Sequence, residues 1–231
     1  MIKNFVAIIP AAGIGSRFNG DTPKQYIKID GKTILERSIE KIINHKFCLE
    51  LVVCTSEEDI WFDELEISRD PRIKKLIGGK TRSESVLKGV NYFNENNRDF
   101  SRFLIHDSVR PCLDDRDLTK ILDTSQEDFD GFVLGFPATD TLKNVTSNNK
   151  IEITIDREKV WHAQTPQVFS KEILISALKN KKKIGEFTDE ASLLEAQGAK
   201  IQMVNGSPNN IKLTYKEDLN TIKSIIRNTE T

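Results

Sequence analysis

The chain has 231 residues, with 34 Lys and Arg against 35 Asp and Glu, which gives a formal net charge of −1. Nucleic acids and anionic membranes usually select a strong basic excess, so this balance argues against both as main partners. Apolar residues make up 38% of the chain, and no apolar run approaches the roughly 18 residues of a membrane span. We therefore expect a globular cytoplasmic protein.

Cysteine and histidine give no metal or redox signature. Cys48, Cys54 and Cys112 are spaced too widely for a zinc or redox motif, and none of the three His residues stands in metal-ligand spacing. We expect reduced thiols. The opening of the chain mimics a short signal peptide, but its apolar part is too short and runs into a glycine motif, so we interpret it as a first strand.

Apolar runs typical of buried strands recur at regular intervals along the chain. They cover residues 5–9, 51–54, 103–105, 132–136 and 201–204. Stretches with helical periodicity lie between them. Strands that alternate with helices predict a parallel or mostly parallel sheet covered on both faces, which is an α/β fold.

Three of the predicted helices begin with a capping box, in which a Thr and a Glu three residues later satisfy each other's backbone amides. The boxes are predicted at residues 33–36, 81–84 and 214–217. Apolar side chains that share one helical face follow each box. Residues 118–122 and 173–178 carry the same periodicity and predict two further helices.

Residues 140–156 depart from this pattern and predict two short polar strands. The isoleucines at 151, 153 and 155 alternate with polar residues, and residues 147–149 have the chemistry of a turn. An isolated two-stranded ribbon is only marginally stable in water. We therefore expect this arm to pack on another surface, with a partner subunit as the obvious candidate.

A glycine-rich turn follows the first predicted strand. Gly13 and Gly15 let the backbone approach a phosphate chain and direct its N–H groups at it, and Arg17 and Lys24 would add full positive charges. The dinucleotide pattern Gly-x-Gly-x-x-Gly fails because its last position is Phe18, and the Walker pattern is absent. The turn therefore indicates an anion site of another kind.

The motif Ala-Ala-Gly-x-Gly-x-Arg at 11–17, with Pro-Lys-Gln at 23–25, resembles the nucleotidyltransferases that activate sugars and sugar-alcohol phosphates. Within that group, the chain resembles the 2-C-methyl-D-erythritol 4-phosphate cytidylyltransferase family of the non-mevalonate isoprenoid pathway. Six further blocks match in order and spacing along nearly the whole chain, which makes the resemblance specific. They are Gly-Gly-Lys-Thr-Arg-Ser-Glu-Ser-Val (78–86), His-Asp-Ser-Val-Arg-Pro (106–111), Thr-Ile-Asp-Arg (154–157), Trp-His-Ala-Gln-Thr-Pro-Gln-Val-Phe (161–169), Thr-Asp-Glu-Ala (188–191) and Asn-Ile-Lys-Leu-Thr (210–214).

The resemblance implies a Rossmann-like fold, a single nucleotidyltransferase domain over residues 1–231 with an inserted β-arm at 140–156, and a homodimer that exchanges this arm. It implies transfer of the cytidylyl group of CTP to 2-C-methyl-D-erythritol 4-phosphate, with Mg²⁺ as the cofactor. In that reaction fixed cations and Mg²⁺ supply most of the catalysis, and no protein nucleophile is required. By resemblance, Arg17, Lys24 and Lys212 converge on the triphosphate and on the phosphorus under attack.

The resemblance also implies the nucleotide contacts. Ala11 and Ala12 match backbone contacts to base and ribose, beside the turn with Gly13 and Gly15, and Gly79 and Ser85 match the positions that read cytosine.

Asp107 follows the predicted strand 103–105, so it should emerge at the carboxyl end, where α/β sheets bind ligands. It would hold Mg²⁺ or orient the nucleotide; the alternative is that it only orients Arg110 through a local ion pair.

For the acceptor, the resemblance assigns Arg157 and Thr141 to the arm of the neighbouring subunit, where they grip the substrate phosphate. The planar fork of arginine suits this task because it binds phosphate in a bidentate manner. Thr165 and Thr188 match positions near the phosphate and hydroxyls of the substrate, and Arg110 joins the phosphate cluster.

Three positions depart from the family pattern, namely Lys80, Ser108 and Asn209. Three other functions stay open at this point. A related enzyme that uses ribitol 5-phosphate would share the phosphate chemistry, and a regulatory module would bind the nucleotide without catalysis. A dinucleotide-dependent oxidoreductase lacks its glycine fingerprint here.

Overall fold

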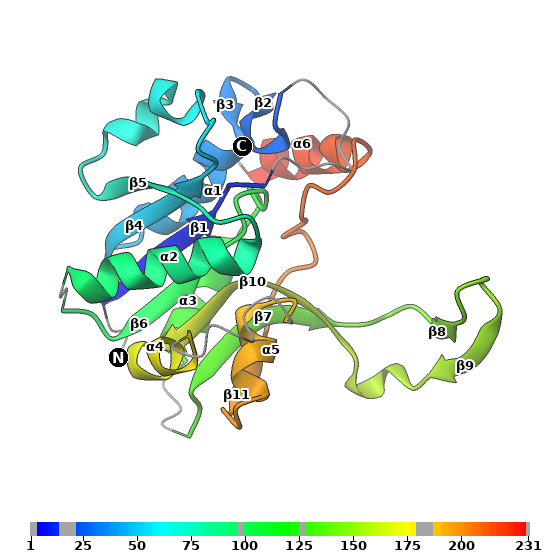
Figure 1. Ribbon diagram of the computed structural model, residues 1–231. Coiled ribbons are helices and arrows are strands. Elements are labelled where there is room, and N and C mark those ends of the chain that lie inside the picture. Colours follow the sequence, from blue (N-terminus) through cyan, green and yellow to red (C-terminus); the bar gives the residue numbers. More distant parts are fainter. Residues whose placement is uncertain (1–3, 14–21, 97–98, 125–127, 179–186, 230–231) are drawn as a thin grey trace.

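The computed structural model describes residues 4–13, 22–96, 99–124, 128–178 and 187–229. Its main sheet has seven strands, in the spatial order β11 (Ile201–Asn205), β7 (Gly131–Pro137), β10 (Trp161–Ser170), β6 (Arg102–Ile105), β1 (Phe5–Pro10), β4 (Cys48–Thr55) and β5 (Ile73–Ile77) (Figure 1). Neighbouring strands are parallel except at β10, which runs antiparallel to β6 and β7. The predicted mostly parallel, Rossmann-like sheet is confirmed.

Helices cover both faces of this sheet. They are α1 (Ile34–Ile43), α2 (Arg82–Glu95), α3 (Asp115–Asp123), α4 (Lys171–Leu178), α5 (Glu190–Glu195) and α6 (Asp218–Thr229). Successive side chains of a strand point to opposite faces, and those of residues 5–9 in β1 are fully buried. Phe5, Ala7 and Ile9 pack in one core with α1 and α3, whereas Val6 and Ile8 pack in a second core with α2, α4 and α5. None of the helices that the structure describes has the length and apolarity needed to cross a membrane.

Two of the three predicted helix caps form. Thr33 and Glu36 make the complete capping box that starts α1. Thr81 caps α2 by accepting the Glu84 amide at 3.1 Å, but the Glu84 carboxylate accepts the amide of Lys80 instead of closing the box. The second box is therefore only half formed.

The third predicted box, at residues 214–217, is wrong. The helix begins later, at Asp218, whose carboxylate accepts the amides of Thr214 at 2.7 Å and Tyr215 at 2.8 Å. An acidic side chain that binds backbone amides in this way holds the chain in a turn and competes with helix formation.

Two strands of the main sheet were not predicted. In β5 two lysines, Lys74 and Lys75, interrupt the apolar pattern; charged side chains of this kind are common in edge strands, where they hinder pairing with other chains. In β10 the sequence contains a proline, a residue that regular central strands usually lack. Pro166 falls in an irregularity, because the register with β7 shifts between Ala163 and Gln167.

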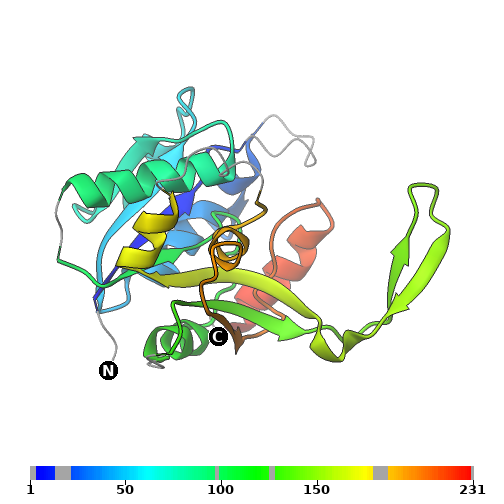
Figure 2. The same cartoon turned by 60° about the horizontal axis from the view of Figure 1, so that its bottom comes forward.

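The predicted ribbon at 140–156 is present as two antiparallel strands, β8 (Leu142–Val145) and β9 (Ile151–Ile155). Figures 1 and 2 show that it extends away from the main sheet as a separate arm. Its apolar side chains Val145, Ile151 and Ile153 are exposed by 44%, 58% and 61%.

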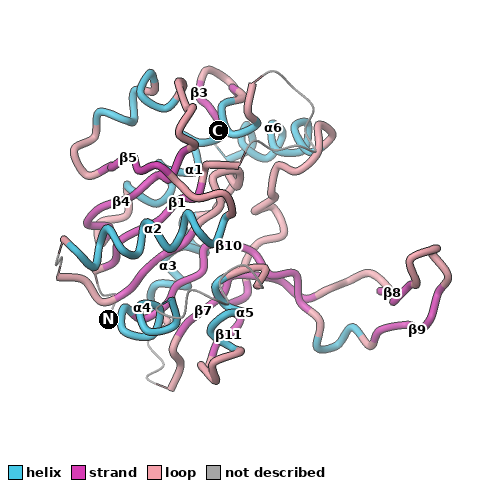
Figure 3. Tube along the Cα trace, viewed as in Figure 1, coloured by secondary structure: helices cyan, strands magenta, loops and turns pink. Residues whose placement is uncertain are grey.

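The segment 206–217 joins β11 to α6 without a helix or strand (Figure 3). Side chains and amides elsewhere in the chain bind it, as described below. It brings Asn210 and Lys212 to the carboxyl end of β6.

Candidate active site

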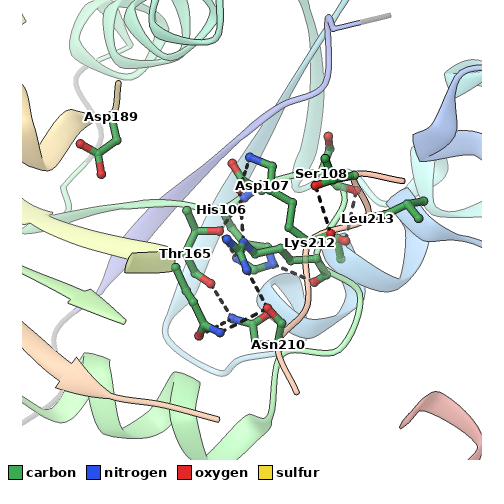
Figure 4. Close-up of polar contacts among 12 residues, drawn as sticks. His106, Asp107, Ser108, Thr165, Asp189, Asn210, Lys212 and Leu213 are labelled. Atoms are coloured by element: carbon green, nitrogen blue, oxygen red, sulfur yellow. Dashed lines mark hydrogen bonds and ion pairs between the residues drawn. The ribbon is translucent and has the colours of Figure 1, made fainter. Parts of the chain in front are cut away.

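Asp107 lies directly beyond β6, at the carboxyl end of the strand. Its Oδ1 lies 3.2 Å from Arg82 Nε, and its Oδ2 lies 3.3 Å from Arg110 Nε and 2.9 Å from Lys212 Nζ. Figure 4 shows the long Lys212 side chain reaching Asp107. Cations from the start of α2, from the segment after β6 and from the segment 206–217 thus converge on one carboxylate.

The charge of Asp107 is fixed by these neighbours. Burial would raise its pKa, but the charges of Arg82, Lys212 and Arg110 outweigh burial and hold the pKa of Asp107 well below its usual range. The side chain of Lys212 is 40% exposed and that of Arg110 only 11%. Lys212 is therefore the cation of this group that is best placed to meet a ligand.

His106 supports the cluster as a neutral group. Its Nδ1 lies 3.1 Å from Thr165 Oγ1, which accepts the Asp107 amide at 2.9 Å, and its Nε2 lies 3.1 Å from the Arg110 carbonyl. These contacts fit a Thr165 hydroxyl that donates to Nδ1 and an Nε2–H that donates to the carbonyl. Complete burial lowers the pKa of His106 to about 4, so the imidazole is uncharged at neutral pH.

Asn210 anchors the segment that carries Lys212. Its side-chain amide is fully buried and donates to the carbonyl of Thr165 at 2.8 Å and to Gln164 Oε1 at 3.3 Å. Its backbone carbonyl accepts from Arg110 at 2.6 Å. The segment is therefore tied to both β10 and the residues after β6, as Figure 4 shows around Asn210.

Lys24 reaches the same segment from the other end of the chain. It lies in a short 3₁₀ turn, residues Lys24–Tyr26, and its Nζ donates to the carbonyl of Leu213 at 2.8 Å. The neighbouring Gln25 is buried and donates to the carbonyls of Ala11 at 3.0 Å and Gly13 at 3.4 Å. The structure thus brings Lys24 against the segment that carries Lys212, the other described residue predicted as catalytic.

The predicted cytosine-reading positions lie where the loops after β1 and β5 meet. The hydroxyl of Ser85 accepts the Gly79 amide at 3.0 Å and donates to the Thr81 carbonyl at 3.0 Å. A Cβ atom at Gly78 would lie 2.7 Å from that of Ala12, so only glycine permits this approach. Ala12, Gly79 and Ser85 therefore lie close together, as the resemblance implied.

Gly15 and Arg17 lie outside the described residues. Two other predicted residues stand apart from this cluster. Thr141 and Arg157 are exposed at the arm, where the Arg157 guanidinium donates to the carbonyl of Thr139. The arm points away from the body that carries Asp107, so within one chain these two residues do not join the cluster (Figure 2).

Sequence reasoning missed two charged residues of the site, Arg82 and Glu190. Glu190 is 2% exposed, and its two oxygens accept from one guanidinium nitrogen of Arg82 at 2.8 and 2.7 Å. Both residues stand inside blocks that matched the family, which was the signal available. Thr188 itself is exposed and lies beside Asp189, which bonds to Gln167 at 2.7 Å.

Within the described part of the chain, the side chains do not form a magnesium site held by the protein alone. No group of three or more potential metal-ligating side chains occurs among the described residues. Asp107, the predicted ligand, has both oxygens engaged by cations. Mg²⁺ requires octahedral oxygen ligands, and a carboxylate that is already paired with three cations does not supply them.

A cavity of about 840 Å³ lies elsewhere, between α1, α3 and α6. None of the predicted site residues lines it. The candidate site is therefore the cluster around Asp107, which lies where α/β sheets bind ligands and which gathers cations before a ligand arrives. Such an arrangement is suited to binding phosphates.

Comparisons with known proteins agree with this class of site. The sequence model described as 2-C-methyl-D-erythritol 4-phosphate cytidylyltransferase matches residues 5–228. The enzyme of that name from Alteromonas mediterranea is 45% identical over 93% of this chain and 89% of its own, and that from Vibrio parahaemolyticus is 42% identical over 94% and 93%. A crystal structure of the Francisella tularensis enzyme superposes with a TM-score of 0.82 at 33% identity, over 96% of this chain and 99% of that chain.

The chain therefore belongs to the 2-C-methyl-D-erythritol 4-phosphate cytidylyltransferase family. These relatives match it over nearly their whole length. The resemblance inferred from the sequence blocks is confirmed, and the ribitol 5-phosphate and regulatory alternatives are not favoured.

Proposed function

We propose that the protein transfers the cytidylyl group of CTP to 2-C-methyl-D-erythritol 4-phosphate and releases pyrophosphate, as a step in the synthesis of isoprenoid precursors. Family membership supports the reaction class. The observation that carries the proposal for this chain is the set of cations that converges on Asp107 at the carboxyl end of β6.

The proposed reaction is a single displacement at phosphorus. An oxygen of the acceptor phosphate attacks the α-phosphorus of CTP, a new P–O bond forms, and the bond to the pyrophosphate oxygen breaks. Negative charge accumulates on the transferred group and on the departing pyrophosphate. Lys24 and Lys212 would stabilise this charge, together with Arg17, because preorganised cations cost no reorganisation during the step.

Asp107 holds Lys212 and Arg110 in position until the nucleotide arrives. Its carboxylate binds Lys212 at 2.9 Å, and the exposed ammonium can exchange this contact for a phosphate oxygen. Arg110 stays oriented by Asp107 and by the carbonyl of Asn210. We therefore propose that Asp107 orients the cations around it. Because His106 is neutral, it adds no further positive charge beside Arg110 and Lys212.

In this proposal Mg²⁺ binds together with the nucleotide. Mg²⁺ usually keeps several waters and binds substrate phosphates together with one or two carboxylates. Because Asp107 is paired with cations, we propose that phosphate oxygens and water provide most of its ligands. When bound, the ion would neutralise part of the triphosphate charge.

The acceptor is proposed to lie near Thr165 and Thr188, with Arg157 and Thr141 supplied by a second subunit. The arm supports this arrangement, because its exposed apolar side chains include Ile151 and Ile153 and call for a covering surface. Thr141 and Arg157 flank the two strands of the arm, which extends away from the main sheet (Figure 2). An exchanged arm would bring a bidentate phosphate ligand to the partner's site.

The test is the conversion of CTP and 2-C-methyl-D-erythritol 4-phosphate by the purified protein. Pyrophosphate and the diphosphocytidyl product should form in equal amounts, and omission of either substrate should stop both. Tight binding of CTP without pyrophosphate release in the presence of Mg²⁺ and acceptor would instead support a regulatory module.

A further inference from the structure

We propose that Arg82 and Glu190 are positioning residues that fix the acceptor-binding loop against the nucleotide site. This inference rests on the proposed function, because it takes Thr188 as an acceptor contact. The new part is which buried charges hold Thr188 in place. Arg82 and Glu190 would support acceptor binding through Thr188 without touching the substrate themselves.

The Arg82 side chain connects two carboxylates that are distant in sequence. Its Nε lies 3.2 Å from Asp107 Oδ1, and its terminal nitrogen binds both oxygens of Glu190 at 2.8 and 2.7 Å. Asp107 and Glu190 are 6% and 2% exposed. One guanidinium therefore links the centre of the cation cluster to the first residue of α5.

The loop around Thr188 is held on both sides of that residue. Phe187 packs against the core beneath α4 and α5. Asp189 accepts from Gln167 in β10 at 2.7 Å and caps α5 by accepting the Ser192 amide at 3.0 Å. Thr188 is exposed between these anchors and thus presents its hydroxyl from a fixed backbone.

A buried glutamate such as Glu190 contributes little to stability. Burial raises its pKa even though Arg82 lies beside it, which means that its ionised form is costly in this position. Burial would likewise lower the pKa of Arg82, but Glu190 and Asp107 raise it above its ordinary value. Replacement of a buried ion pair by well-packed apolar residues is often neutral or stabilising, so the pair is better explained by orientation than by stability.

The geometry predicts an asymmetric effect. If Glu190 becomes neutral, Arg82 keeps its contact with Asp107, which also retains Arg110 and Lys212. The nucleotide side should therefore change little. The start of α5 loses its charged anchor, so Thr188 is held less firmly and acceptor binding should weaken.

The experiment compares Glu190→Gln with Glu50→Gln as a matched control. Glu50 is 5% exposed and accepts from the hydroxyl of Tyr92 at 2.7 Å, but it pairs with Val6 near the amino end of β1, away from the site. KM for each substrate and kcat are measured for both variants and for the unchanged protein. Arg82→Lys serves as a second test, because an ammonium cannot reproduce the fork of arginine.

Glu190→Gln should raise KM for the acceptor about tenfold, with KM for CTP and kcat within about twofold. Arg82→Lys should raise KM for the acceptor by at least as much, and because Arg82 also contacts Asp107, its effect is not confined to the acceptor. Hydrogen exchange at the amides of residues 187–190 should also accelerate in both, and neither change should occur in Glu50→Gln. In Glu190→Gln, equal effects on the two KM values, or an acceptor KM like that of Glu50→Gln, would overturn the inference. An inactive unchanged protein would instead contradict the proposed function.

Discussion

Asp107 gives the candidate site its organisation at the scale of single residues. The sequence predicted that cations would gather around phosphates, and Lys24 does bind the segment that carries Lys212. In the structure, however, Lys212 and Arg110 bind a carboxylate directly. A buried negative charge therefore keeps like charges close together before any phosphate binds.

Lys212→Ala should lower kcat about 10²–10³-fold, the usual loss when one preorganised donor to a developing oxyanion is removed. Asp107 would keep Arg82 and Arg110, so the fold should survive. Lys216→Ala is the control, since Lys216 is an exposed lysine in the same segment. Pyrophosphate release measures both, and equal rates for the two variants would remove Lys212 from the catalytic set.

His106 predicts how stability depends on pH. Its pKa is about 4 in the folded protein and about 6.5 when unfolded, so the unfolded state binds the extra proton first as the pH falls. Stability should decrease by about 3 kcal/mol from this group between pH 6.5 and 4. Asp107, whose pKa is lowered, adds a loss only below about pH 4.

Urea unfolding at a series of pH values measures this effect. His106→Asn carries no titrating group at that position, so its stability should fall less steeply between pH 6.5 and 4. Glu190, whose pKa is raised, contributes in the opposite direction but equally in both proteins. Parallel curves for the two proteins would contradict a neutral buried His106.

At the scale of elements, the same sequence pattern has different outcomes at two helix starts. The Thr-x-x-Glu pattern forms a full box at Thr33 and none at Thr214. The difference arises at Asp218, whose carboxylate accepts the Thr214 amide that the Glu217 carboxylate would accept in a box, and the Tyr215 amide as well. Such competition depends on side-chain geometry, which the pattern does not contain.

Thr33→Ala should therefore destabilise the protein by about 1 kcal/mol, and Thr214→Ala by less than about 0.5 kcal/mol. Thr33 is buried and caps α1, whereas the Thr214 hydroxyl only contacts the Lys212 carbonyl at 3.3 Å. Thermal unfolding of the two variants measures the difference. A larger loss for Thr214→Ala would mean that it caps α6 after all.

Much of the fold and part of the site could be predicted from the sequence. Apolar runs located five of the seven strands of the main sheet, and the position of Asp107 followed from the end of β6. β10 was hidden because three of its buried side chains, Gln164, Thr165 and Gln167, are polar and interrupt the apolar pattern. The Arg82–Glu190 pair joins residues 108 positions apart, and no local pattern predicts it.

At the scale of the whole molecule, the arm decides whether one chain suffices. Within a single chain, Arg157 lies on the arm and Lys24 lies in the body (Figure 1). If the site is shared, a dimer of Lys24→Ala and Arg157→Ala chains contains one intact site. An equal mixture should then recover about a quarter of the unmutated activity, because half of the dimers are mixed.

Each homodimer is inactive in this scheme, so the activity of the mixture is measured against a low background. Subunit exchange is checked by differently tagged chains. Mixed dimers that form without any gain in pyrophosphate release would contradict a site built from two subunits.

The chain as a whole has 34 positive and 35 negative side chains, a balance that can be compared with the charges in the site. The described site contains four cations, Lys24, Arg82, Arg110 and Lys212, and two carboxylates, Asp107 and Glu190. It is basic, but less so than the predicted set of cations alone. A site of this kind suits a small polyanion better than a nucleic acid.

The most direct measurement of the central claim is the rate of pyrophosphate release from CTP with two acceptors. We predict that kcat/KM for 2-C-methyl-D-erythritol 4-phosphate exceeds that for ribitol 5-phosphate by at least about tenfold. The blocks at 154–157, 161–164 and 188–191 favour the first acceptor. A preference for ribitol 5-phosphate, or no release with either acceptor, would contradict the account.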